Sequence, residues 1–544
     1  MRDARASARA AIADAANREI KIIRALDGVE FARATATHAS NRNETNRTTT
    51  TRATTTTMRD DDRTYDAAVR ELAKTITGKK RADPGALTWE AQFAQLETYV
   101  SRLDLRGRVD ALDVVHVAGT KGKGSTCAMV EGMLRASGTR VGTFTSPHLM
   151  DVRERFRIDG AMVDEETFAR EFWWTRDAIA ARCGDLGMPA YFRFLTLLGL
   201  RIFSSAGVEA CVLEVGLGGR LDATNVVRAP AACGITSLGM DHVDILGDTL
   251  GKIATEKAGI MKPGVRTFTA PQKPEAMVAL ERRAAEVGSP LVVARDLDSY
   301  EGGSEIEVGL AGPHQRVNAA VAVELVREWA NATNQPWAEE MEASFARNEL
   351  PESFRVGLEK TTWPGRSQVM HDPDVMNLTF YLDGAHTIES MRHSAEWFTS
   401  TARAVTAAEH NIMLFNCMDD RKPEDLLEPV ADVFHTTSNV QLERAIFSPP
   451  DSTTSGLDKC GDAKATSWQD RCARTWDDII VKRANVLAEK AQDTRGVVVS
   501  SIHQALSLIR HRAREVAPAR VNVLVTGSLY LVGDVLRHLK KCVK

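Results

Sequence analysis

The 544-residue sequence predicts an α/β protein with two domains, a larger N-terminal one and a smaller C-terminal one. Short apolar runs alternate with amphipathic helical segments, a pattern typical of a mainly parallel sheet with helices on both faces. This alternating series occurs twice along the chain, and Pro351, Pro364 and Gly365 interrupt it between the two occurrences. A glycine-rich loop also joins the first central strand to a helix.

The composition limits the function classes. The net charge is −4, so no basic excess indicates a nucleic-acid partner. The eight cysteines contain no C-x-x-C pair, which favours reduced thiols in a cytosol-like compartment. No apolar run approaches the roughly 18 residues of a membrane span. We therefore expect small-molecule ligands and no membrane span.

These patterns divide the chain into four parts: an extension over 1–57, a domain over 58–350, a hinge over 351–366 and a domain over 367–544. The extension is rich in Arg, Ala and Thr, and we expect it to be disordered. Its Arg-rich and Ala-rich start resembles a mitochondrial or plastid transit peptide, although its acidic residues are atypical of one. One alternative is an extension without a targeting role. Met58 is also an alternative start, which would give a cytoplasmic form that lacks the extension.

The elements are expected in the following order. In the first domain, strands are expected near 113–117, 140–145, 210–215, 231–236, 266–269 and 291–293, and helices over 65–72, 89–103, 127–134, 165–181, 192–205, 249–258, 274–287 and 315–330. In the second domain, strands are expected over 378–382, 411–415 and 521–525, and helices over 387–399, 424–433 and 529–540. The polar stretch 448–464 predicts an exposed insertion.

The stretch His116–Thr126 has the composition of a phosphate-binding loop. Its glycines let backbone N–H groups turn toward an anion, the following helix contributes its positive end, and Lys123 and Ser125 can reach a phosphate and its metal. It departs from the usual G-x-x-x-x-G-K-[ST] pattern because Val117 replaces the first glycine and Gly124 separates Lys123 from Ser125. The alternative is a glycine turn that binds nothing.

Two further strand ends carry candidate metal ligands. Glu214 ends an apolar strand, and His242 lies between Asp241 and Asp244 after another. The carboxyl ends of parallel strands share one edge of a sheet, where ligand sites form. Taken singly, each residue is as well explained by an ion pair or a loop turn. Together with the glycine loop they predict a magnesium site.

Four other residues are candidates on similar grounds. Lys257 lies in a helix that could abut the phosphates, although a solvated helix lysine is the alternative. Asp383 and His386 follow a strand of the second domain, where they can face a site in the first. Ser528 follows the last strand and could be only a helix N-cap.

These residues belong to a longer set of motifs: 119–125 (GTKGKGS), 145–149 (TSPHL), 214–220 (EVGLGGR), 241–242 (DH), 256–260 (EKAGI), 364–366 (PGR) and 383–386 (DGAH). Their order resembles that of folylpolyglutamate synthases, within the wider Mur ligase superfamily, from about residue 65 to the C-terminus. The resemblance implies a P-loop-type ATPase domain, a smaller Rossmann-like domain and an active site in the cleft between them. Two substrates and a metal also need surfaces that close on them.

The resemblance implies an ATP-dependent ligase that adds L-glutamate to the γ-carboxylate of a (tetrahydro)folate carrying glutamate, through an acyl phosphate. ADP and phosphate are the other products. ATP and Mg²⁺ are the implied cofactors, together with a monovalent cation and a carbamylated Lys257. The implied partners are folate, glutamate and ATP, and the implied assembly is a monomer.

The site residues that the resemblance implies fall into four groups. The catalytic ones are Lys123, Lys257 and His386. Those around ATP are Gly119, Thr120, Gly122, Lys123, Gly124, Ser125, Thr126, Asn318, Arg366 and Asp383. The metal ligands are Ser125, Glu214 and His242. The folate and glutamate positions are Ser146, Pro147, Arg155, His386 and Ser528.

Two departures from many bacterial members indicate the eukaryotic type. Thr387 replaces an asparagine after the Gly-Ala-His, and the insertion over 448–464 has no evident bacterial counterpart. The eukaryotic type generally lacks dihydrofolate synthase activity. A dihydrofolate synthase remains the alternative within the ligases, and a P-loop switch or binding protein driven by ATP is the alternative from another class.

Overall fold

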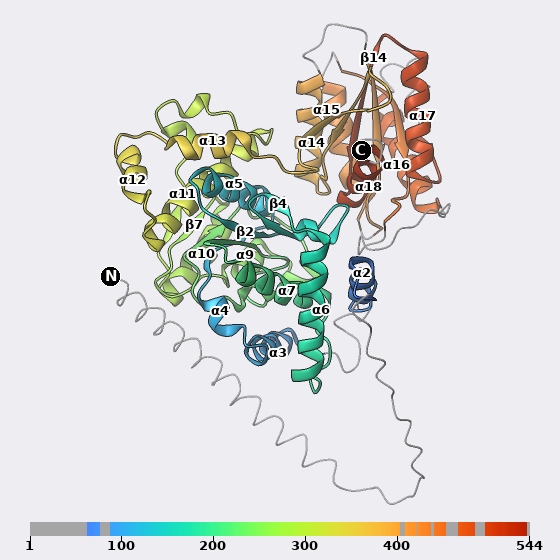
Figure 1. Cartoon of the computed structure of the whole chain (residues 1–544). Helices are drawn as coiled ribbons and strands as arrows, with labels where there is room; N and C mark the ends of the chain where they lie inside the picture. The colour runs from blue at the N-terminus through green and yellow to red at the C-terminus, as the bar shows by residue number, and fades with distance from the viewer. Residues whose placement is uncertain are drawn as a thin grey trace, which may run out of the picture.

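A computed structural model describes residues 62–76, 87–402, 409–419, 421–436, 440–452, 466–484 and 496–540. The expected extension over 1–57, Met58 and most of the expected insertion over 448–464 lie outside these residues. Two sheets organise the described chain, one for each expected domain. Figure 1 shows the part built from residues 367 onward, in orange and red, beside the larger part that precedes it. The two-domain α/β class is therefore confirmed.

The first sheet has eight strands in the order β4-β3-β2-β5-β1-β6-β7-β8. Its strands are β1 (Asp113–Ala118), β2 (Val141–Phe144), β3 (Phe156–Ile158), β4 (Ala161–Met162), β5 (Ala210–Glu214), β6 (Ala232–Ile235), β7 (Thr267–Thr269) and β8 (Leu291–Val293). All neighbours from β2 to β8 are parallel, whereas β3 and β4 add an antiparallel edge. The sequence prediction missed this short edge because two or three residues carry no clear period.

Helices cover both faces of the first sheet. They are α2 (Tyr65–Ala73), α3 (Trp89–Arg102), α4 (Arg106–Asp110), α5 (Lys123–Ala136), α6 (Glu165–Arg182), α7 (Tyr191–Ala206), α8 (Val243–Leu246), α9 (Leu250–Ala258), α10 (Pro274–Val287), α11 (Pro313–Thr333), α12 (Ala338–Ala346) and α13 (Glu352–Lys360). One core joins the strands to α5 and α11. The opposite face packs against α6 and α7 at one end and α9 and α10 at the other.

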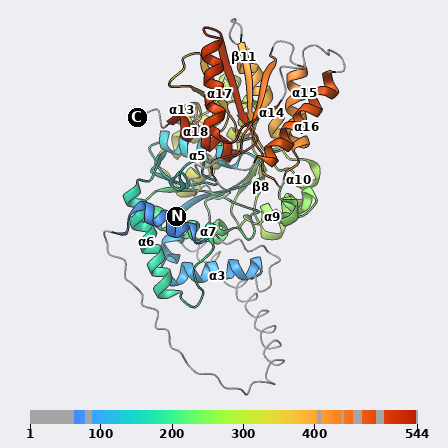
Figure 2. The ribbon, with the colours of Figure 1, turned by 90° about the vertical axis from the view of Figure 1, so that its right-hand side faces the viewer.

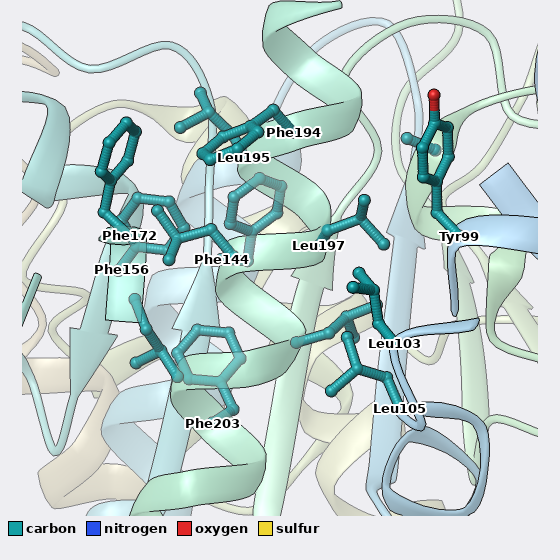
Figure 3. Close-up of a cluster of buried hydrophobic side chains, with 14 of the residues drawn as sticks. Tyr99, Leu103, Leu105, Phe144, Phe156, Phe172, Phe194, Leu195, Leu197 and Phe203 are labelled. Carbon is teal, nitrogen blue, oxygen red and sulfur yellow. The ribbon is translucent and has the colours of Figure 1, made fainter. Parts of the chain in front are cut away.

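The core beneath α7 is mainly aromatic. Phe194 and Phe203 on α7 are buried against Phe144 and Phe156 from neighbouring strands and Phe172 from α6 (Figure 3). Each fully buried ring contributes roughly 1.5–3 kcal/mol to folding. This packing fixes β2 and β5, whose carboxyl ends carry candidate site residues.

The second sheet has six strands in the order β13-β12-β11-β14-β10-β9. Its elements are β9 (Gln368–His371), β10 (Leu378–Leu382), α14 (Ile388–Ala402), β11 (Glu409–Phe415), α15 (Pro423–Thr436), β12 (Leu442–Phe447), α16 (Ser467–Ala484), β13 (Gly496–Val498), α17 (Ile502–Glu515), β14 (Arg520–Thr526) and α18 (Leu529–Lys540). Only β9 is antiparallel. The core with α14, α15 and α16 covers one face, and the core with α17 and α18 covers the other (Figure 2).

The expected second series was incomplete. Strands β9, β12 and β13 and helices α16 and α17 were not predicted. Helix α16 contains many charged residues between Ser467 and Ala484, and these obscured its apolar periodicity. The expected hinge over 351–366 contains α13, and this helix packs on α5 of the first domain. The bounds of the hinge stay a prediction. Among the described helices, none is both long and apolar enough to cross a bilayer.

Candidate active site

The glycine loop lies between β1 and α5, and its neighbours determine its shape. Gly119 has φ +152°, and a Cβ there would lie 1.8 Å from Oγ1 of Thr236. Gly122 has φ +84°, and a Cβ there would lie 2.1 Å from Oδ1 of Asn318. Only glycine combines this backbone with so little space. The structure thus brings Asn318, on α11, against the loop.

Two lysines converge on one carbonyl of the loop. Nζ of Lys123 donates to the Gly119 oxygen at 3.1 Å, and Nζ of Lys257 donates to the same oxygen at 2.7 Å. Burial, with the nearby Lys123 charge, lowers the pKa of Lys257 to about 7. The alternative of a solvated helix lysine is therefore wrong. The pair concentrates positive charge where the glycine loop would hold a phosphate.

Glu214 reaches the start of α5 from the end of β5. Its side chain is buried, and Oε2 accepts the Ser146 N–H at 2.8 Å. A methyl group at Gly124 would lie within 3.7 Å of both carboxylate oxygens, one residue before Ser125. Burial raises the pKa of Glu214, and the Lys123 charge opposes this rise. A buried carboxylate that faces the first turn of α5, where Ser125 lies, fits the hard oxygen donors that Mg²⁺ prefers.

His242 lies farther out in the site. It adopts φ +51° before α8, its side chain is 47% exposed, and Nε2 lies 3.8 Å from Oδ2 of Asp241. Burial lowers its pKa, and the charges of Lys257 and Lys123 add to the effect against that of Asp241. Among the described residues, no three His, Cys, Asp or Glu side chains gather as a metal cluster. A metal set here would therefore need the Ser125 hydroxyl and phosphate or water oxygens.

Arg366 lies between the two sheets. Burial lowers the pKa of Arg366, whereas the charges of Asp383, after β10, and Glu214, at the end of β5, raise it. Asp383 in turn accepts the N–H groups of Ser367 at 2.8 Å and Ala385 at 3.0 Å. The charges of one carboxylate from each domain thus act on this guanidinium.

His386 has a defined tautomer. Its Nδ1 donates to the Gly384 carbonyl at 2.8 Å, because a carbonyl oxygen can only accept. This leaves Nε2 as a lone-pair acceptor. Burial, together with the charge of Lys121, lowers the pKa of His386 to about 4, so the ring is neutral at physiological pH. A neutral imidazole in this place can accept a proton.

Arg155 occupies the other end of the site. Its Nε donates to Nδ1 of His148 at 2.9 Å, and its guanidinium lies 5.7 Å from the ring centroid of Tyr191. The Arg155 charge also acts on Tyr530, so a residue of α18 in the second domain faces it. Ser528 Oγ accepts the Tyr530 N–H at 3.2 Å. This contact is that of a helix N-cap, which is the alternative role expected for Ser528 from the sequence.

The remaining candidates keep to the same edge. Thr126 is fully buried, and its hydroxyl donates to the Asn318 carbonyl at 3.5 Å. Oγ1 of Thr120 donates to the Gly239 carbonyl at 3.2 Å. Ser146 and Pro147 follow β2, beside Glu214 on β5. Thr120, Ser146 and Pro147 follow the carboxyl ends of β1 and β2, whereas Thr126 lies in the first turn of α5.

Three residues near the site were not singled out from the sequence. Nε1 of Trp363 lies 3.3 Å from where a methyl group at Gly124 would sit. Lys121 of the loop donates to the Thr387 hydroxyl, and Arg421 donates to Asp241 at 3.4 Å. Trp363 stands directly before the Pro-Gly-Arg motif, which was an available signal. Nothing local marks Arg421, because its partner is 180 residues away.

Known proteins resemble this chain over most of its length. No family model matches it. A curated folylpolyglutamate synthase from Arabidopsis thaliana is 40% identical over 513 residues, which cover 88% of this chain and 89% of that protein. The human mitochondrial folylpolyglutamate synthase is 34% identical, with 88% of this chain and 92% of that protein covered.

Solved structures share the fold. The folylpolyglutamate synthase from Thermotoga maritima superposes with a TM-score of 0.62 at 24% identity, over 88% of this chain and 96% of that one. A bifunctional folylpolyglutamate synthase/dihydrofolate synthase from Yersinia pestis, complexed with AMPPNP and a manganese ion, gives 0.62 at 24% identity, over 88% and 98%. With relatives at 34–40% identity over nearly nine-tenths of its length, the chain belongs to the folylpolyglutamate synthase family.

Proposed function

We propose that the protein is an ATP-dependent ligase that joins L-glutamate to the γ-carboxylate of a folate that already carries glutamate. The observation that carries this proposal is the convergence of Lys123 and Lys257 on the Gly119 carbonyl, beside the buried Glu214. This arrangement suits a nucleotide's terminal phosphates. The family membership supports the choice of folate and glutamate as substrates.

The chemistry is a transfer in two steps. A carboxylate oxygen of the folate attacks the γ-phosphorus of ATP, ADP leaves, and an acyl phosphate forms. The nitrogen of the incoming glutamate then attacks the acyl carbon, and phosphate leaves as the amide bond forms. Ser125, Glu214 and His242 would hold Mg²⁺, whose charge would offset that of the phosphates.

The chain's own residues bind and orient these groups. The backbone amides of residues 122–125 and the Lys123 ammonium hold the phosphates, and Asn318 contacts the adenine. Arg366 from the hinge and Asp383 from the second domain complete the nucleotide site. Nε2 of His386 accepts the proton that the attacking amine loses, because this nitrogen carries a lone pair. Positioning both substrates in one closed cleft makes the second step effectively intramolecular.

The folate and the incoming glutamate bind on the far side of the phosphates. Ser146 and Pro147 line the folate, whereas Arg155, His386 and Ser528 bind glutamate. Arg155 is buried beside Tyr191 and His148, so its charge is available to a carboxylate that enters this low-dielectric site. Bidentate pairing would orient that carboxylate.

Lys257 is proposed to carry a carbamate. The modification forms on a neutral amine, and the pKa of about 7 leaves a substantial neutral fraction at physiological pH. The carbamate would replace a cation by an anion close to the metal. Intact-protein mass under carbon dioxide tests this: an added carboxyl group supports it, and a bare amine excludes it.

The decisive experiment incubates the protein with tetrahydrofolate, ATP, Mg²⁺ and labelled glutamate and measures the product mass. The proposal requires a gain of one glutamate residue and an equal release of ADP. Activity on dihydropteroate but not on tetrahydrofolate would instead indicate a dihydrofolate synthase. Nucleotide hydrolysis independent of both pterin and glutamate would indicate an ATP-driven switch.

The proposed assembly and location rest on the sequence and on the names of two relatives. We propose a monomer in the cytoplasm, with a mitochondrial or plastid form directed by residues 1–57. The human and bovine relatives are named mitochondrial, which supports the targeting proposal. Fusing residues 1–57 to a fluorescent reporter tests the targeting proposal, because an extension without a targeting role leaves the reporter in the cytoplasm.

A further inference from the structure

Lys121 is a residue of the glycine loop that the proposed mechanism does not use. The loop holds it firmly, because its backbone N–H donates to the Ser237 carbonyl at 3.0 Å. Its side chain leaves the first domain, and Nζ donates to the hydroxyl of Thr387 in the second. The two residues are 266 positions apart in sequence. This hydrogen bond is therefore a direct connection between the phosphate loop and the other domain.

Thr387 is well placed to transmit this connection. It directly precedes α14, and its carbonyl accepts the Met391 N–H at 2.8 Å. Its N–H and hydroxyl both contact Oγ of Ser390, at 3.0 and 2.9 Å. His386 is its chain neighbour, and the N–H of His386 also donates to Ser390 Oγ at 3.2 Å. Moving Thr387 would thus move the turn that carries His386.

Stability alone does not explain a lysine in this position. Burial lowers the pKa of Lys121 to about 8, so placing the ammonium here costs free energy. The N-terminus of a helix such as α14 also disfavours a cation. The charged groups around it are balanced, with Asp241 and Glu389 opposed by Lys123 and Arg421. A second contact, from Arg421 to Asp241 at 3.4 Å, joins the domains in the same region.

We propose that Lys121 and Thr387 form an interdomain latch that positions the turn carrying Asp383 and His386 over the phosphate loop. Lys121 is a positioning residue, because it acts through Thr387 on groups that face the substrates. The proposal rests on the proposed ligase function. The latch adds to that function a residue pair that couples closure of the second domain to the glycine loop, where the nucleotide phosphates bind.

Paired substitutions test the latch in the full-length protein. Lys121→Met removes the charge at similar length, and Thr387→Val removes the hydroxyl at similar volume. We expect each to lower kcat/KM for glutamate about tenfold or more, since a hydrogen bond to a charged group is lost. The double variant should be no worse than Lys121→Met, and Thr387→Ser should restore near-normal turnover. Circular dichroism should stay close to that of the wild type.

Lys273 provides the matched control. It also faces α14, where Nζ lies 3.9 Å from Glu389, but both side chains are more than 60% exposed. Lys273→Met should therefore change kcat/KM less than twofold. If the fold-losses of kcat/KM for Lys121→Met and Thr387→Val multiply in the double variant, the proposal is overturned. A damaging Lys121→Met with a silent Thr387→Val would also overturn it, because Lys121 would then act directly on a substrate.

A measurement independent of activity separates the latch from the ligase function. Small-angle X-ray scattering with AMPPNP and Mg²⁺ should give a larger radius of gyration for Lys121→Met than for the wild type and Lys273→Met. Equal radii would overturn the latch even if the enzyme is active. Absence of glutamate-dependent ADP release from the wild type would overturn the ligase function instead, and the scattering comparison would still decide the latch.

Discussion

At the scale of single residues, the site depends on backbone positions that tolerate no side chain. Gly122 has a left-handed backbone and lies against Asn318, so the loop needs glycine for two independent reasons. The sequence showed the glycines but not what they contact. Only the packing of α11 on α5 identifies the partner, because Asn318 is almost 200 residues from the loop.

Gly122→Ala should weaken nucleotide binding at least tenfold. The left-handed backbone alone costs an alanine about 1–2 kcal/mol, and the contact with Asn318 adds to this. Isothermal titration with ADP measures the effect. Gly239→Ala is the control, because nothing lies within 4 Å of its Cβ position, and its affinity should match the wild type. Equal affinities in both variants would contradict the proposed loop.

Lys123→Ala should reduce glutamate-dependent ADP release by at least a hundredfold while the protein stays folded. The Lys123 ammonium supplies positive charge at the glycine loop, where the phosphates are proposed to bind. Steady-state kinetics measures the loss, and circular dichroism checks the fold. Retained turnover in a folded variant would remove Lys123 from the catalytic set.

At the scale of elements, close helix packing supports the site from behind. Helix α13 crosses α5 at a pair of glycines, where a Cβ at Gly357 would lie 2.5 Å from the Cα of Met133 and one at Gly132 would lie 2.8 Å from the Gly357 carbonyl. Small residues let two helices approach this closely. Because α5 begins in the glycine loop, this contact fixes the helix whose N-terminus faces the phosphates.

Gly357→Ala should destabilise the protein by about 1–3 kcal/mol, because overpacked backbone cannot move aside easily. Gly107→Ala in α4 is the matched control, since nothing lies within 4 Å of its Cβ position, and it should be neutral or stabilising by up to about 1 kcal/mol. Thermal unfolding with and without ADP measures both. Similar melting temperatures for the two variants would contradict the packing argument.

At the scale of the whole molecule, a histidine at the contact between the domains responds to pH. His314, at the start of α11, stacks on His393 of α14 with ring centroids 5.5 Å apart and an interplanar angle of 9°. Burial, with the charges of His393 and Arg366, lowers the pKa of His314 to about 4. The ring is therefore neutral in the folded protein at pH values where the unfolded chain protonates it.

The folded protein should lose stability as the pH falls from about 6.5 to about 4. In this window the unfolded chain binds a proton at position 314 and the folded protein does not, so acid favours unfolding. Each such histidine accounts for about 1–2 kcal/mol between pH 7 and pH 5. His314→Gln should reduce the pH dependence by that amount, as measured by urea unfolding at both pH values. An unchanged pH dependence would contradict a neutral His314.

Periodicity predicted the central strands and their helices well. Several predicted ranges, including 378–382, 274–287 and 529–540, match β10, α10 and α18 at both ends, because apolar spacing is a local property of the chain. The edge strands β3, β4 and β9 were missed, since short edges bury little and show little pattern. The polar region containing α16 was missed for a similar reason.

The sequence by itself determined the α/β class, the glycine loop and the strand ends that carry Glu214, Asp383 and His386, because parallel strands present their carboxyl ends at one edge. Tertiary structure alone decided which of these groups meet. It buried Lys257 against the Gly119 carbonyl, brought the charges of Glu214 and Asp383 to act on Arg366, and joined Lys121 to Thr387. These contacts join residues more than a hundred positions apart or depend on burial, and local sequence patterns encode neither.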